Sequence, residues 1–208
     1  MTAKEVGRAR ALQAGALCLD YPDENWRAQL PLLRGAAESL PGVAGESLTR
    51  FVGHAERTPA AALERDYVDT FDLRRRCCLY LTYYAFGDTR KRGMALLKFT
   101  HAYRTAGFTL DSGELPDHLA VVCEFAARRA EPGLRLLQEN RAGIELLHLA
   151  LTDADSPYAD VIDVVRAVLP EAAPKDLAKA LELARSGPPA EEVGLEPFAP
   201  PEHMGARR

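Results

Sequence analysis

The sequence has little cysteine and no long hydrophobic run. Its four cysteines among 208 residues form no Cys-x-x-Cys pair, which excludes a small disulfide-bonded secreted domain and favours a reducing compartment. The most hydrophobic stretch, residues 144–151, contains Glu145 and His148 and is far shorter than the roughly 20 apolar residues of a membrane-spanning helix. The first residues also lack the apolar stretch and cleavage site of a secretory signal. These absences predict a cytoplasmic protein without stable membrane insertion.

Motifs of common chemistries are missing too. There is no phosphate-binding glycine loop, no His-Glu-x-x-His pair and no Gly-x-Ser-x-Gly elbow. The five histidines are scattered, and His148 lies on an apolar stripe where a hydrogen-bonded boundary residue is expected. The sequence therefore predicts a protein that is not an enzyme and that holds no metal ion or permanently bound cofactor.

Cys77 and Cys78 leave one enzymatic alternative open. Both follow a run of three arginines, Arg74 to Arg76, and neighbouring cations lower the pKa of a thiol and so favour a nucleophilic thiolate. Against this, no histidine base is near in sequence, and free cysteines usually behave as small buried apolar residues.

Apolar residues recur three and four positions apart along most of the chain, which is typical of amphipathic helices. Proline, glycine and capping residues divide the pattern; Asp88 is the expected N-cap of one helix and Gly107 its terminator. The sequence predicts an all-α, single-domain helical bundle of about nine to ten helices. The expected helices cover 8–19, 24–40, 47–57, a stretch beginning near 59, 73–86, 89–106, 117–130, 133–151, 158–169 and 175–185.

Composition changes near the end of the chain. Residues 187–208 combine glycines and glutamates with five prolines, a mixture that cannot build a packed core. We therefore expect a helical domain over residues 1–186 and a disordered, proline-rich tail over 187–208.

Charge is unevenly distributed. The net charge is −4, yet residues 74–104 contain eight basic residues and one acidic residue, a local charge of +7. Such a stretch is either a solvated helix face with internal ion pairs or a surface that attracts an anionic partner or ligand. A nucleic-acid-binding scaffold is a third reading, which the overall negative charge disfavours.

Two segments carry candidate binding residues. In the first, Pro116 precedes Asp117, so the carboxylate is expected in the first turn of a helix; capping alone explains this, but Asp117 and Glu124 on one helix side would also suit cations of an incoming peptide. In the second, Tyr67 and Phe71 form an apolar face beside aspartates. That face is either core or, together with the following arginines, a surface for an amphipathic peptide or polar cofactor.

The same segments resemble a known family. The runs 67–76 (Tyr-Val-Asp-Thr-Phe-Asp-Leu-Arg-Arg-Arg), 79–84 (Leu-Tyr-Leu-Thr-Tyr-Tyr) and 87–97 are similar to the delta subunit of respiratory nitrate reductase, the NarJ-type assembly chaperones. The run 115–119 (Leu-Pro-Asp-His-Leu), followed by Glu124 and Phe125, resembles the signature of the broader TorD-like redox enzyme maturation chaperones. The likeness is most specific over residues 67–127.

The resemblance implies a helical cytoplasmic chaperone that binds the catalytic (alpha) subunit of respiratory nitrate reductase at its N-terminal segment. Such a chaperone keeps the apo-enzyme competent for molybdenum cofactor insertion before membrane docking, with cofactor-delivery proteins as further partners. A helical scaffold for another molybdoenzyme or for an anionic ligand is the alternative. The family signature and its neighbourhood name the expected client-binding residues as Tyr67, Phe71, Asp72, Arg74, Pro116, Asp117, His118, Glu124 and Phe125. Of these, Asp117 and His118 are the expected direct contacts.

Overall fold

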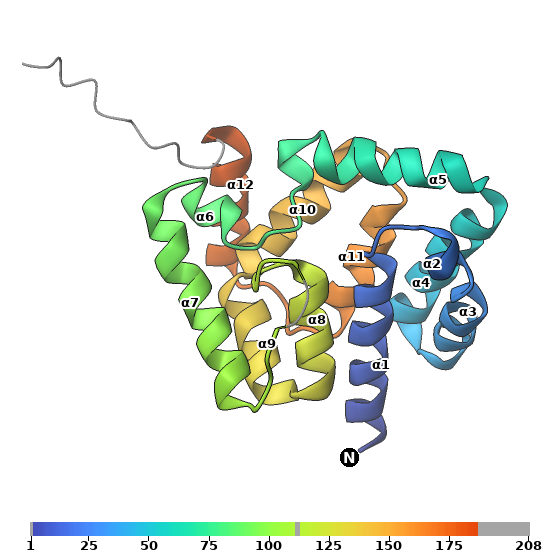
Figure 1. The fold of residues 1–208 in the computed structure, drawn as a ribbon, viewed down its shortest axis with the longest axis horizontal. Coiled ribbons are helices and arrows are strands. Elements are labelled where there is room, and N and C mark those ends of the chain that lie inside the picture. Colours follow the sequence, from blue (N-terminus) through green and yellow to red (C-terminus); the bar gives the residue numbers. More distant parts are fainter. Residues whose placement is uncertain (1, 111–112, 187–208) are drawn as a thin grey trace, which may run out of the picture.

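The computed structural model describes residues 2–110 and 113–186, which form an α-helical assembly without a β-sheet (Figure 1). The all-α prediction is confirmed. These residues contain twelve α-helices, a π-helix (η1) and a 3₁₀-helix (η2). Their bounds are α1 Ala3–Cys18, α2 Glu24–Arg27, α3 Leu30–Ser39, α4 Gly42–Arg57, α5 Ala60–Tyr67, η1 Val68–Asp72, η2 Arg75–Cys77, α6 Tyr83–Phe86, α7 Arg90–Thr105, α8 Leu119–Arg128, α9 Ala130–Glu139, α10 Arg141–Asp153, α11 Tyr158–Ala167 and α12 Pro174–Ser186.

The first helix begins five residues before the predicted start at Arg8. Thr2 and Glu5 form a capping box, in which each side chain accepts from the other residue's backbone N–H. From this cap, α1 runs through the middle of the molecule, where it packs against α8, α11 and α3 (Figure 1). Leu12 and other residues on one of its faces are fully buried, while another face stays open to solvent.

The predicted helix 24–40 is two helices. Asp23 caps α2 by accepting from the Trp26 N–H at 2.7 Å, and a break at residues 28–29 separates it from α3. Pro31 lies in the first turn of α3; in a continuous helix its ring would clash with the carbonyl four residues earlier. Buried Trp26 anchors the corner, because its indole N–H donates to the Leu17 carbonyl at 2.6 Å.

The prediction of one helix over 73–86 is wrong. The chain continues α5 into η1, where the Leu73 N–H bonds the Val68 carbonyl five residues back, and then forms η2, an extended stretch and the short α6. The extended stretch pairs with residues 117–119 through an isolated antiparallel bridge between Tyr80 and His118. A partner distant in sequence therefore overrides the helical periodicity here.

The ends of α7 show one correct prediction and one error. Gly107 follows the helix with φ +79°, the left-handed conformation expected of a terminator. Asp88 is not the N-cap: Thr89 holds that position, and its hydroxyl donates to the Phe86 carbonyl at 2.7 Å in place of a capping bond. Asp88 instead pairs with Arg92 one turn into the helix, at 3.2 Å.

Close helix packing completes the core. Helix α4 packs on both α3 and α11, and α10 packs on both α11 and α12. Where α8 meets α9, a Cβ on Gly133 would lie 2.2 Å from the Ala126 Cα, so only glycine permits this approach. Within the described residues, no helix is both long and apolar enough to cross a membrane. The predicted tail, 187–208, lies outside the described residues.

Candidate functional site

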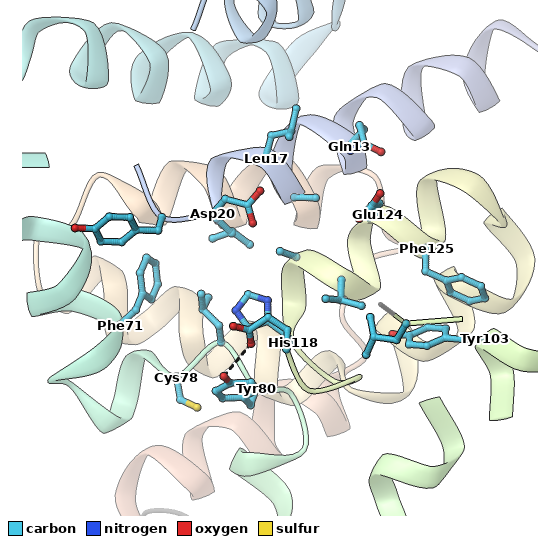
Figure 2. Close-up of a pocket in the computed structure, with 18 of the residues that line it drawn as sticks. Gln13, Leu17, Asp20, Phe71, Cys78, Tyr80, Tyr103, His118, Glu124 and Phe125 are labelled. Atoms are coloured by element: carbon cyan, nitrogen blue, oxygen red, sulfur yellow. Dashed lines mark hydrogen bonds between the residues drawn. The ribbon is translucent and has the colours of Figure 1, made fainter. Parts of the chain in front are cut away.

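A cavity of about 580 Å³ opens between the C-terminal end of α1, η1, the extended stretch before α6, and α8. We call it the signature cavity, because six of the predicted binding residues line it. Figure 2 shows Gln13, Leu17 and Asp20 along one side, with Phe71, Tyr80 and His118 across from them. Segments far apart in the sequence therefore share one site.

Aromatic rings form two walls of the signature cavity. On one side, the Tyr67 ring contacts Phe71 with centroids 4.9 Å apart, and its hydroxyl donates to the Leu19 carbonyl at 2.9 Å. On the other side, Phe125 contacts Tyr103 at 4.6 Å. These edge-on contacts hold the rings in place and leave apolar area available to a ligand.

The charged residues of the lining are mostly acidic. Asp20, Asp72, Glu114 and Glu124 line the cavity, whereas its one arginine, Arg128, is paired with Glu124 at 2.6 Å. Asp20 is exposed to solvent on one side, but desolvation by the surrounding protein, reinforced by the negative charges of Glu124, Glu114 and Asp23, raises the pKa of its carboxyl from 3.8 to about 6. A cation placed here would relieve this repulsion, so the cavity suits a ligand with apolar groups and positive charge.

Asp117 lies inside the protein, not on a helix surface. It is fully buried and precedes α8, whose N-cap is His118, so the prediction that Asp117 and Glu124 share one helix side is wrong. One carboxylate oxygen accepts from the Thr82 N–H at 3.0 Å and from the Thr82 hydroxyl at 2.6 Å. The carboxylate therefore joins the loop before α8 to the stretch before α6.

Backbone bonds reinforce the same junction. The Leu81 N–H donates to the Asp117 carbonyl at 3.1 Å, and the Leu119 N–H donates to the Leu79 carbonyl at 2.8 Å. The Tyr103 hydroxyl adds a bond to the Pro116 carbonyl at 2.6 Å. This junction fixes where Tyr80 and His118 enter the cavity wall.

Arg92 on α7 closes the junction from outside. Its Nε donates to the Thr82 hydroxyl at 3.3 Å, and its Nη2 lies 3.9 Å from the Asp117 carboxylate. The guanidinium also lies over the rings of Tyr80 and Tyr83, 5.4 and 5.8 Å from their centroids. At least one cation of the basic stretch is thus used internally.

His118 faces the cavity from this junction. Only 8% of it is exposed, and its ring lies edge-on to Tyr80 at 5.3 Å. Burial lowers the pKa of the imidazole, and the charges of Glu114 and Asp117 oppose that effect only in part. His118 is therefore a neutral hydrogen-bonding group at neutral pH.

The predicted site residues separate into two groups. Six line the signature cavity: Tyr67, Phe71, Asp72, His118, Glu124 and Phe125. The other three do not: Asp117 is enclosed, Pro116 is half-buried outside the lining, and Arg74 is exposed between η1 and η2.

Sequence reasoning missed the contribution of α1. Gln13, Leu17 and Asp20 line the cavity, but in the sequence they look like ordinary positions of an amphipathic helix and the turn after it. Only the packing of α1 on α8 brings Asp20 near Glu124. Tyr80 lay within a family-like run, but nothing marked it as a cavity residue.

The cysteines do not have the environment of a nucleophile. Burial raises the pKa of the Cys77 thiol, against the opposing effect of Arg74, and burial also raises the pKa of the Cys78 thiol. This is opposite to what a thiolate mechanism needs. His148 pairs with Asp163 at 3.1 Å, as a boundary residue would, and no group of three or more potential metal ligands occurs among the described residues.

The fold has a counterpart of known structure. A protein from Archaeoglobus fulgidus assigned to redox enzyme maturation superimposes with a TM-score of 0.58, covering 80% of this chain and 93% of the other at 22% identity. The chain thus has the helical fold of a redox enzyme maturation protein. Residues 23–163 match the family model described as nitrate reductase delta subunit, and the chain belongs to this family.

Relatives give the likeness in more detail. The chain is 34% identical over 154 residues to the Bacillus subtilis nitrate reductase molybdenum cofactor assembly chaperone NarJ, covering 73% of this chain and 83% of that protein. The corresponding Escherichia coli K12 chaperone NarJ is 28% identical over 151 residues. The nitrate reductase-like protein NarX of Mycobacterium tuberculosis is 41% identical over 154 residues, but the match spans only 23% of its length. The NarJ relatives are assembly chaperones and not catalysts, in agreement with the prediction of a non-enzyme.

Proposed function

We propose that this chain is an assembly chaperone for nitrate reductase that binds the catalytic (alpha) subunit through its N-terminal segment. By holding that segment, it keeps the apo-enzyme competent for molybdenum cofactor insertion before membrane docking, and it does so in the cytoplasm. The molybdenum cofactor belongs to the client. Membership of the family and the names of the NarJ relatives support the chaperone role.

The signature cavity is the observation that carries the binding site. It combines aromatic walls with four carboxylates, and six of its lining residues are binding residues predicted from the segments that resemble the family. Apolar anchors with a nearby charge are the usual means of recognising a short peptide. We assign Tyr67, Phe71 and Phe125 to apolar contact, Asp72 and Glu124 to attraction of a cation, and His118 to hydrogen bonding.

The remaining predicted residues receive other roles. Asp117 and Pro116 position the cavity wall through Thr82 and Tyr103. Arg74 is exposed beyond the lining, where it is available to a part of the client outside the cavity. The proposed activity requires only residues within 1–186.

Two matched ion pairs allow a sharp test. Glu124 pairs with Arg128 in the cavity, and Glu131 pairs with Arg135 on α9 outside it, both one helical turn apart. Isothermal titration with a synthetic peptide of the client's N-terminal segment should show binding to the wild type and weaker binding to Glu124→Gln. Glu131→Gln should bind like the wild type.

The outcome that overturns the proposal is equally specific. If the wild-type protein does not bind the peptide, and pull-down from nitrate-grown cells does not recover the catalytic subunit in its cofactor-free form, the proposed client is wrong. Equal loss of affinity in both glutamine variants would place the binding site elsewhere.

A further inference from the structure

A second hollow continues the signature cavity along α1. It has a volume of about 720 Å³ and lies between α1, α3 and the end of α8. Gln13, Leu17 and Arg128 line both hollows. The two hollows therefore share a wall, and we call the pair the α1 groove.

One face of α1, together with Asp20 in the turn after it, provides the floor. Val6, Arg10, Gln13, Leu17 and Asp20, which follow one another three or four positions apart, all line the groove. At about 1.5 Å per residue, the distance from Val6 to Asp20 corresponds to roughly 20 Å. This length suits a helix of about four turns.

The far end of the groove is apolar. Its α3 wall includes small or apolar residues that recur on successive turns, Leu32, Gly35, Ala36 and Ser39. Leu32 is 65% exposed, and a Cβ built on Gly35 meets no atom within 4 Å. The wall thus offers apolar area and room for a neighbouring helix.

Charge differs between the two ends. The signature cavity contains four carboxylates, of which Glu124 is paired with the shared Arg128, whereas the α3 end contains no acidic residue and adds a second arginine, Arg10. The C-terminal end of α1, which carries partial negative charge, also lies at the acidic end. A helix in this groove is therefore stabilised when its positive N-terminus lies at Asp20 and its C-terminus lies toward Arg10.

The geometry points to an oriented, two-part peptide site: the client's segment docks as an amphipathic helix antiparallel to α1, with its N-terminus in the signature cavity and its apolar face against α3. This inference rests on the proposed function, and it adds the α3 wall and the direction of the client helix. It makes Leu32, Gly35 and Arg10 specificity residues, although none of them belongs to the signature segments.

The α3 wall can be tested with substitutions on α3, each matched by a control substitution on α7. Gly35→Gln fills the groove with a polar side chain, and Gly93→Gln makes the same change at a helical glycine with equally open space. Leu32→Gln removes an exposed leucine, and Leu97→Gln, at 57% exposure, is its counterpart. Glutamine has a higher helix propensity than glycine, so Gly35→Gln and Gly93→Gln should both fold.

Titration with the client peptide should show different affinities for the α3 variants and their α7 controls. We expect Gly35→Gln and Leu32→Gln to weaken binding about tenfold, and Gly93→Gln and Leu97→Gln to bind as the wild type does. If the wild type binds the peptide but the α3 variants bind it equally well, the α1 groove is wrong and the proposed function stands. If the wild type does not bind at all, the proposed function itself fails.

The direction of the helix is tested by charge coupling. At pH 7 the peptide's N-terminal amine is mostly protonated, and acetylation removes that charge. Acetylation should weaken binding to the wild type about three- to fivefold, should have less effect in Glu124→Gln, and should have its full effect in Arg10→Gln. If Arg10→Gln reduces the effect of acetylation and Glu124→Gln does not, the proposed direction of the helix is wrong.

Discussion

Glu145 and Asp117 are both buried carboxylates, but their surroundings differ. Glu145 on α10 receives Arg141 at 2.7 Å and Arg166 at 3.0 Å, so two guanidinium groups occupy its oxygens. Asp117 binds Thr82 through one oxygen, has its nearest cation at 3.9 Å, and leaves its other oxygen without a hydrogen-bond partner in the described structure. Both oxygens of Glu145 are paired with cations inside the bundle, although Nη1 of Arg141 has no partner there, whereas Asp117 keeps one unpaired oxygen behind the wall of the binding cavity.

The largest effect is expected at Glu145. Replacing Glu145 by alanine leaves the buried Arg141 guanidinium without its ion-pair partner and Arg166 without its shared acceptor, which should lower the free energy of unfolding by about 3 to 5 kcal/mol. Urea denaturation measures this loss. Glu131→Ala removes an exposed pair of the same spacing and should cost no more than about 0.5 kcal/mol. Similar losses of unfolding free energy in both variants would mean that the buried ion pairs of Glu145 stabilise the protein no more than the exposed pair of Glu131 does.

A smaller loss, with an effect on binding, is expected at Asp117. Asp117→Ala removes the acceptor of two Thr82 bonds and should cost about 1 to 3 kcal/mol, and it should also weaken binding of the client peptide. Asp117→Asn keeps a carbonyl oxygen for Thr82 and should recover most of both properties. If the asparagine variant folds well but binds as poorly as the alanine variant, Asp117 acts by its charge and not by positioning the wall.

Asp20 should show a smaller effect of opposite sign. Because the pKa of Asp20 is raised to about 6 in the folded protein, the folded state binds a proton more tightly than the unfolded state, and stability falls as pH rises from about 4 through 6. Asp20→Asn should therefore be more stable than the wild type at pH 7 to 8, by about 1 kcal/mol after allowance for solvent screening. At pH 4 the difference should vanish.

Thermal melts across this pH range check the sign. Glu171→Gln, an exposed carboxylate in the loop before α12, provides the control and should show no such trend. An Asp20→Asn advantage that is equal at pH 4 and pH 8 would mean that it does not come from the carboxyl's ionisation.

The smallest effect is expected from the C-terminal residues. The described residues that line the α1 groove fall between Val6 and Arg128, and Thr82 and Arg92 support the Asp117 junction from within the same range. Deleting 187–208 should therefore leave the affinity for the client peptide within about twofold. A larger loss in titration would assign part of the binding site to the deleted residues.

Much of the fold could be predicted from local patterns. The apolar repeat, the prolines and Gly107 were enough for an all-α bundle and for most helix positions. The errors have two kinds of cause, one tertiary and one local. Residues 73–86 have helical periodicity, but Asp117 and Leu119 pair with them from a distance, and Pro31 divides a helix that apolar spacing alone would join.

The candidate site, too, could be predicted from the sequence only in part. Residues of the family-like segments, such as Tyr67 and Phe125, were identified because their types and order resemble a known signature, and both line the cavity. Asp117 was identified for the same reason, but its burial gives it a supporting place. Asp20 was not identified, because its importance depends on carboxylates that approach it only in the folded chain.

The sequence by itself determined the helical class, the family and three of the cavity's aromatic residues, Tyr67, Phe71 and Phe125, since these depend on residue types and short-range spacing. Tertiary structure decided which carboxylates meet, which arginine of the basic stretch turns inward, and that one face of α1 joins an acidic cavity to an apolar groove. The physical reason is that burial and electrostatic interaction act through space, between residues about a hundred positions apart. The spacing of residues along the chain does not predict how close such residues lie in the folded protein.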